Sequence, residues 1–255
     1  MWPLRAVVFC AICAWSNALL TSPRAFTPSL IRRGCDTNKL HMLDPVQVEG
    51  ALSAAGGLVV ADGGNAVPSA LAAYGHYLGL VLVSMSLAVE RILVKPGMSI
   101  ENEKVMGYAD IVYGLAGTLV LYTGYLRVTE YGKGWEFYQH EPVFWVKMLL
   151  FSVMGASSLF PTIKIIQRAI KINDAEKGKG EMPALMSEAL ATRMKKVING
   201  ELLAIGSIPL TAALMSRGVG YSDGFPWQAG AGVVGLSVVG LGFKYTREAL
   251  QFKEE

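Results

Sequence analysis

The chain has 255 residues, of which 52% are hydrophobic and 17% are charged, whereas an ordinary soluble domain has roughly 25% charged residues. Its formal net charge is +3, and because phosphate binding needs a concentrated basic face, this balance excludes nucleic acid as a partner. The charged residues occur in blocks between long uncharged stretches, a pattern that predicts a protein of the lipid bilayer.

Two targeting signals are predicted in series at the N-terminus. Residues 1–25 combine the early basic residue Arg5 with a short apolar run, as in a secretory signal peptide that is removed. Residues 26–45 are rich in basic and hydroxyl residues, as in an organelle transit peptide. The junction at Phe26 resembles the cleavage motif of bipartite presequences in algae with complex plastids. We therefore expect a plastid protein, with a plain secretory signal as the alternative.

Removal of this presequence limits the cysteine chemistry of the mature protein. Cys10 and Cys13 lie in the leading apolar run, and Cys35 lies close behind it. The mature chain then keeps at most one thiol, which excludes thiolate zinc sites, iron–sulfur clusters and structural disulfides. Removing Arg5 and Arg24 from the 23 basic residues leaves 21 against 20 acidic residues, so the mature protein is nearly neutral.

Five apolar segments follow an Ala- and Gly-rich tail at residues 46–67. The clearest candidate for a transmembrane helix has no formal charge over 21 residues, about the length that crosses a hydrocarbon core. In chain order the five segments are 69–89, 111–126, 143–163, 202–216 and 226–243. The predicted fold is therefore all-α, with a four-helix membrane domain over 68–220 and a fifth, glycine-rich helix with a tail over 221–255.

Basic residues fall mainly on one side of the bilayer if these five spans alternate in direction. Fourteen of them lie on the side of the long loop 164–196, against three on the other side. By the positive-inside rule we expect the basic side to face the stroma, with the C-terminus there and the mature N-terminus in the lumen or intermembrane space. An apolar stripe over 183–197 predicts a helix lying on the membrane surface.

Ionisable residues near the span ends are the candidate functional residues, because a bilayer tolerates them only when they are paired or used. On the basic side these are Glu90, Arg91, Asp110 and Glu201. Two interpretations stay open for them. Either Arg91 forms an ion pair with a carboxylate and locks the helix ends, or the carboxylates form a proton or ion relay.

The opposite side of the membrane carries a second set, which is His76, Arg127, Lys147 and Arg217. His76 and Lys147 come from different predicted helices at similar depth, so their side chains could meet. One interpretation is an interhelical hydrogen bond and a snorkelling lysine. The other is an axial haem site, for which imidazole is the common ligand. No metal site is predicted.

Several short strings carry a resemblance to a known family. They include His76-Tyr77-Leu78-Gly79, Glu90-Arg91, Tyr131-Gly132-Lys133-Gly134 and Leu214-Met215-Ser216-Arg217-Gly218. From about Ala73 to Gly220 the chain resembles the predicted membrane proteins called domain of unknown function 2214, found in cyanobacteria and plastid-bearing organisms. This resemblance implies a four-helix core and no established activity. A weaker similarity to the membrane-embedded, oxygen-independent protoporphyrinogen oxidase implies haem ligands at His76 and Lys147.

The sequence contains no nucleotide-binding loop, nucleophile elbow or metal-binding helix motif, which disfavours ATP-driven transport, hydrolysis and metalloprotease chemistry. We expect an integral membrane protein of the thylakoid or inner envelope, structural or accessory to a membrane complex and without catalysis of its own. One alternative is a haem-binding redox protein of tetrapyrrole metabolism, which would be a haem-linked oxidoreductase. The other is a small proton- or ion-coupled transporter. The expected partners are the lipid bilayer and other membrane proteins.

Overall fold

The computed structural model describes residues 63–252, so both predicted targeting signals lie outside the described residues. Contacts divide the chain into a unit of residues 1–71 and a unit of residues 72–255. The described part of the first unit is the start of helix α3 (Gly63–Leu93). Residues 63–67 are therefore helical, although the sequence placed them in the N-terminal tail.

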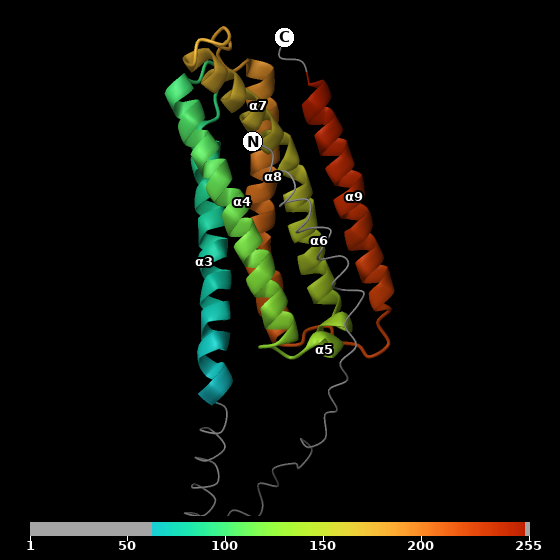
Figure 1. Ribbon diagram of the computed structural model, residues 1–255. Coiled ribbons are helices and arrows are strands. Elements are labelled where there is room, and N and C mark those ends of the chain that lie inside the picture. The colour runs from blue at the N-terminus through green and yellow to red at the C-terminus, as the bar shows by residue number, and fades with distance from the viewer. Residues whose placement is uncertain (1–62, 253–255) are drawn as a thin grey trace, which may run out of the picture. The chain divides into compact units, whose positions relative to one another are not determined.

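All regular secondary structure among the described residues is helical. After α3 come α4 (Ile100–Thr129), α5 (Trp135–Gln139), α6 (Pro142–Ser157), α7 (Leu159–Glu176), α8 (Glu188–Ser216) and α9 (Trp227–Gln251) (Figure 1). Five stretches are long and apolar enough to cross a membrane: Asn65–Leu93, Ile100–Thr129, Pro142–Glu176, Glu188–Ser216 and Trp227–Gln251. Each overlaps one predicted span, so the all-α fold with five candidate spans is confirmed.

The third of these stretches consists of two helices, α6 and α7, with a break at Ser158. Pro161 explains the break, because proline has no N–H to donate to the carbonyl four residues earlier and its ring crowds that turn. The hydroxyl of Ser157 donates to the carbonyl of Met154 over 3.0 Å, and that of Ser158 donates to Gly155 over 2.8 Å. The break therefore concentrates hydroxyl groups where two helices meet.

The loop between the third and fourth spans is much shorter than predicted. α7 continues to Glu176 and α8 begins at Glu188, so the loop covers residues 177–187 instead of 164–196. The side chain of Ser187 caps α8 by accepting a hydrogen bond from the amide of Leu190, which fixes where the helix begins.

The prediction of a membrane-surface helix over 183–197 is wrong. Residues from Glu188 onward form the first turns of α8. Leu190 and Met194 from the apolar stripe are fully buried in the protein. Met186 is also buried, and its carbonyl accepts a hydrogen bond from the amide of Gly97 in the turn between α3 and α4. The apolar stripe therefore packs against protein. The prediction failed because a helix on a lipid surface and a helix against a protein core have the same apolar pattern.

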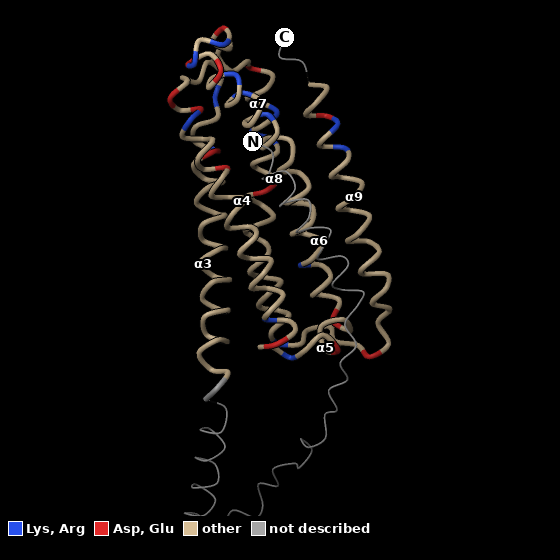
Figure 2. Tube along the Cα trace, in the orientation of Figure 1, with Lys and Arg blue, Asp and Glu red and all other residues tan. Residues whose placement is uncertain are grey.

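Lysine and arginine residues gather at the end of the bundle where α4 begins and α7 ends (Figure 2). Inside this end, a buried ion pair joins α4 to α7. The Nε and Nη2 atoms of Arg168 each donate to a carboxylate oxygen of Glu103 over 2.7 Å. Nη2 of Arg168 also donates to the carbonyl of Ala184, so the same guanidinium holds the loop 177–187 against the helices.

Aromatic side chains close the opposite end of the bundle. The Trp135 ring makes edge contacts with Phe144, Trp145 and Trp227 at centroid distances of 6.1, 6.0 and 6.3 Å. The indole N–H of Trp145 donates to the carbonyl of Gln139 over 2.9 Å. Tryptophan is typical of the boundary between lipid and water, which fits a membrane surface at this level.

The last helix, α9, lies at the edge of the bundle and packs along α6 and α7 (Figure 1). Gly230 allows this contact, because a Cβ atom there would lie 2.5 Å from the Trp145 ring. A Cβ atom at Gly232, Gly235 or Gly240 would meet nothing within 4 Å in the described part of the chain. The close approach of α9 to Trp145 of α6 therefore depends on Gly230, near the start of α9.

α3 and α4 also pack closely, at glycines on both helices. A Cβ atom at Gly79 would lie 2.6 Å from Val120 Cγ2, and one at Gly124 would lie 3.2 Å from the His76 ring. Real Cβ atoms essentially never approach a neighbour as closely as 2.6 Å. The small residues let the two backbones approach, as in other helix pairs in membranes.

We expect Gly79→Ala to lower the melting temperature of the purified protein in detergent. Overpacking at this contact costs about 1–3 kcal/mol, which outweighs the gain in helix propensity of up to about 1 kcal/mol. The matched control is Gly117→Ala in α4, where an added methyl group meets nothing within 4 Å. Equal melting temperatures for the two variants would contradict the close packing of α3 on α4.

Candidate functional site

Three carboxyl side chains from three helices are buried close together in the bundle. Glu90 lies near the end of α3, Asp110 lies in α4 and Glu201 lies in α8. Their exposed fractions are 2%, 8% and 1%, respectively. Asp110 acts electrostatically on Glu90, and both of them act on Glu201. We call these three residues the carboxylate cluster.

Hydroxyl groups provide part of the hydrogen bonding in this cluster. Thr162 donates to Asp110 Oδ1 over 2.6 Å, and Ser157 Oγ, whose proton also faces the carbonyl of Met154, lies 3.4 Å from Glu201 Oε1. Among the described residues, Glu90 Oε1 and Glu201 Oε2 have no hydrogen-bond partner. Because an unpaired buried carboxylate is strongly unfavourable, these oxygens require a proton, a water molecule or a cation.

The two hydroxyl groups beside the cluster come from either side of the one-residue interruption at Ser158. Ser157 ends α6, and Thr162 lies in the first turn of α7. Tyr113 of α4 forms a hydrogen bond with Ser158. All three carboxylates also act electrostatically on Tyr113. The cluster is therefore enclosed by polar side chains of the broken span and of α4.

Arg91 does not neutralise the carboxylate cluster. Its Nε atom donates to Asn199 Oδ1 over 2.6 Å at an exposed position. The ion pair expected between Arg91 and Glu90, Asp110 or Glu201 is thus replaced by a hydrogen bond to a neutral amide. The interpretation that ion pairs lock the helix ends required Arg91 as the cation, and Arg91 bonds to Asn199 instead.

His76 is held in place from α4. Its Nδ1 atom lies 3.1 Å from the carbonyl oxygen of Val120 and 3.2 Å from Thr123 Oγ1. Gly124 leaves room for the ring, as described above. Because the carbonyl of Val120 can only accept, the Nδ1–H tautomer fits this arrangement, and Nε2 is then free to accept or to bind a ligand.

Two of the ionisable residues predicted on the same side as His76, Arg127 and Lys147, lie near it, whereas Arg217 does not. Lys147, which is half-buried, and Arg127 both act electrostatically on His76. Arg127 also lies over the ring of Tyr77, 5.3 Å from its centroid. Arg217 instead donates to the carbonyl of Ala213 over 3.1 Å at the end of α8. A histidine, a lysine and an arginine from three helices therefore share one region.

A family described as predicted membrane protein (DUF2214) matches residues 68–220. The chain belongs to this family. No curated protein and no solved structure matches the chain. The description of DUF2214 agrees with the membrane assignment predicted from hydropathy.

Every residue predicted for a site lies within the segment that matches DUF2214. The carboxylate cluster is formed by helices of this segment, and so is the region around His76. α9 lies outside it. The two candidate sites therefore belong to the part of the chain that defines the family.

Sequence reasoning missed the polar residues that lie around the candidate sites. Thr162 and Ser157 were counted only as parts of an apolar span, although the nearby Pro161 is a signal that the helix is interrupted. Glu141 was also missed. It is fully buried at the start of α6, and neither carboxylate oxygen has a hydrogen-bond partner among the described residues. Burial raises the pKa of Glu141 above its ordinary value, and the charge of Lys133 opposes this shift.

Proposed function

We propose that this DUF2214 protein is a small proton- or cation-coupled transporter whose ion-binding residues are Glu90, Asp110 and Glu201. The observation that carries the proposal is the burial of three carboxyl groups from three helices within reach of one another's charge. Three such groups cannot all be ionised in a medium of low dielectric constant without a counter-ion. Bound protons or a bound cation would neutralise the negative charge of the three carboxyl groups.

The broken span supports the same function. Transporters commonly form their ion sites where a transmembrane helix is discontinuous, because the interrupted region offers polar groups inside the membrane. Here Ser157 and Thr162, on either side of the one-residue interruption at Ser158, place hydroxyl groups beside two of the three carboxylates. The structural or accessory role that we expected first depended on ion pairs with Arg91, which contacts Asn199 instead.

We expect Glu90→Gln and Glu201→Gln to reduce proton or monovalent cation flux at least tenfold in proteoliposomes loaded with an ion-sensitive dye. The amide keeps the size of the side chain but cannot carry the ion. Glu101→Gln, an exposed position in the first turn of α4, is the matched control and should retain the flux. A loss of accumulation without a specific loss of flux would favour a structural role.

Chemical labelling tests the protonated form of the cluster without a known substrate. A hydrophobic carbodiimide reacts with protonated carboxyl groups that are shielded from water. We expect peptide mass spectrometry to find the modification on at least one cluster residue and none on Glu101. If the wild-type protein shows neither flux nor labelling in the cluster, the transporter proposal fails and an accessory role in a membrane complex takes its place.

The region around His76 supports a second candidate function, which is haem binding. An imidazole fixed through Nδ1 leaves Nε2 directed by the protein, which is how ligand histidines are commonly oriented. Lys147 would provide the second donor. Haem bound there would supply one-electron redox chemistry, while the hydrogen bond to Val120 and the contact with Gly124 would set the angle of the His76 ring.

If haem binds, the protein purified in detergent should show a Soret band and a positive pyridine haemochrome assay. His76→Ala should abolish both signals, and Lys147→Ala should shift the band if the lysine amine is the second ligand. His140→Ala is the matched control, since His140 is the C-cap residue of α5 and does not belong to α3 or α4. A colourless protein that takes up no added haem would remove this candidate.

We also propose that the protein resides in a plastid membrane, thylakoid or inner envelope, with the C-terminus in the stroma. The two targeting signals predicted from the sequence and the basic end of the bundle in Figure 2 support this proposal. A four-helix core with α9 as an addition is consistent with the extent of the DUF2214 match. Membrane proteins of the same compartment would then be the available partners.

Cysteine labelling tests this orientation. In a chain without native cysteines, Lys179→Cys should react with a membrane-impermeant maleimide added to the stromal side. Asp223→Cys should react only after the membrane is opened. Both positions are exposed, in the loop 177–187 and in the turn before α9. The reverse pattern would show that the basic end faces the lumen.

A further inference from the structure

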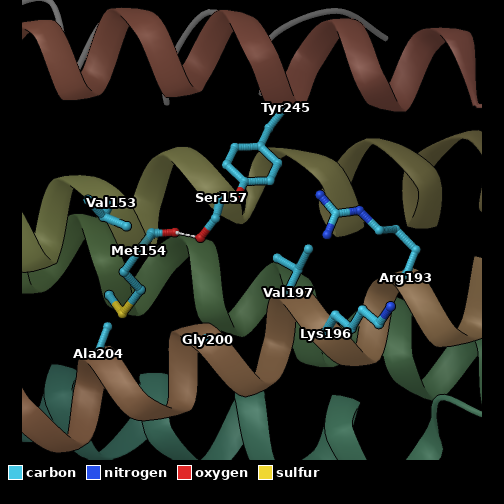
Figure 3. A pocket seen from close by; sticks show the side chains of 9 residues that line it. All are labelled: Val153, Met154, Ser157, Arg193, Lys196, Val197, Gly200, Ala204 and Tyr245. Carbon is cyan, nitrogen blue, oxygen red and sulfur yellow. Dashed lines mark hydrogen bonds between the residues drawn. The ribbon is translucent and has the colours of Figure 1, made fainter.

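A cleft of about 140 Å³ lies between α6, α8 and α9. Its two ends differ in chemistry, as Figure 3 shows. Arg193 and Lys196 of α8 lie at one end, and Val153, Met154 and Ala204 lie at the other. Tyr245 extends from α9 between the two ends. A ligand that fills this cleft therefore has an anionic part and an apolar part.

The positive charge at the polar end is held in position by the protein. Nη2 of Arg193 donates to Glu248 over 2.9 Å, and the guanidinium lies 5.8 Å from the centroid of the Tyr245 ring. Lys196 is exposed and has no hydrogen bond or ion pair with the described residues. Because Glu248 balances Arg193, the cleft has a net charge of about one unit from Lys196, which suits a singly charged anion.

The cleft lies toward the basic end of the bundle. It is near the start of α8 and the end of α9, where Lys and Arg gather (Figure 2). Anionic lipids are attracted to basic residues at a membrane surface. Leu203 of α8, which precedes the cleft residue Ala204, is exposed and apolar.

We propose that this cleft binds the headgroup of an anionic membrane lipid. The polar end would hold a phosphate or sulfonate group, and the apolar end would hold the adjoining glycerol and the first methylene groups. A free inorganic anion would use only the polar end. The combination of charge complementarity and the apolar end formed by Val153, Met154 and Ala204 therefore favours a lipid over a soluble anion.

This binding site shares a wall with the carboxylate cluster, although the proposal does not depend on transport. Ser157 lines the cleft, and its Oγ atom lies 3.4 Å from Glu201 Oε1. A headgroup next to Ser157 would change the surroundings of Glu201 through one hydroxyl group. The bound lipid is thus placed to influence whatever the cluster does.

Native mass spectrometry of the full-length protein, exchanged into detergent with phosphatidylglycerol or phosphatidylcholine, tests the proposal. We expect one phosphatidylglycerol molecule to be retained in preference to phosphatidylcholine. Lys196→Ala should weaken its binding about fivefold, the factor for one basic residue near an anionic lipid. Gly200→Leu should abolish retention, because Gly200 lines the cleft and a Cβ atom there meets nothing within 4 Å.

Two matched variants control for general effects. Lys171→Ala removes an exposed basic residue of α7 outside the cleft, and Gly206→Leu adds the same side chain to α8 where a Cβ atom meets nothing. Both should retain phosphatidylglycerol as the wild type does. Unchanged retention in Lys196→Ala and Gly200→Leu would overturn the proposal. Complete displacement of the lipid by millimolar inorganic phosphate would also overturn it in favour of a site for a soluble anion.

Discussion

The unfavourable free energy of a charge inside a bilayer governs this structure. Helices satisfy the backbone amides where water is absent, but each ionised side chain still needs a partner. The buried pair of Glu103 and Arg168 meets this requirement with two short hydrogen bonds. In the described part of the chain, the charges that act on Glu201 are those of Glu90 and Asp110, which have the same sign as its own. The hydroxyl groups of Ser157 and Thr162 provide only partial compensation.

Hydropathy was sufficient to predict the five spans and to place Glu90, Asp110 and Glu201 on one side of the membrane. It could not predict that they converge, because the rotation of each helix about its axis depends on packing, such as the contact at Gly79. The role of Arg91 could not be predicted for the same reason. Adjacent residues point about 100° apart on a helix, so the neighbour of Glu90 in sequence faces Asn199 instead.

The length of the helix beyond the third span was underestimated for a related reason. Lys164 and Arg168 suggested a loop, yet both are buried in α7, with exposed fractions of 5% and 4%. The carboxylate partner of Arg168 is 65 positions away in the sequence. Composition cannot distinguish a lysine or arginine in a solvated loop from one that a distant acid neutralises. The sequence therefore predicted a loop where α7 continues to Glu176, and the membrane-surface helix was an error of the same kind.

The tight contact between α3 and α4 has a mechanical consequence. Two helices locked at Gly79 and Gly124 should move as one rigid hairpin, so relative motion is confined to the surface between this hairpin and the remaining helices. Glu90 and Asp110 belong to the hairpin, whereas Glu201 belongs to α8. Repulsion across that surface would arise when all three groups are ionised and would vanish when they are neutral. The buried pair of Glu103 and Arg168, which joins α4 to α7, opposes any separation of the two bodies.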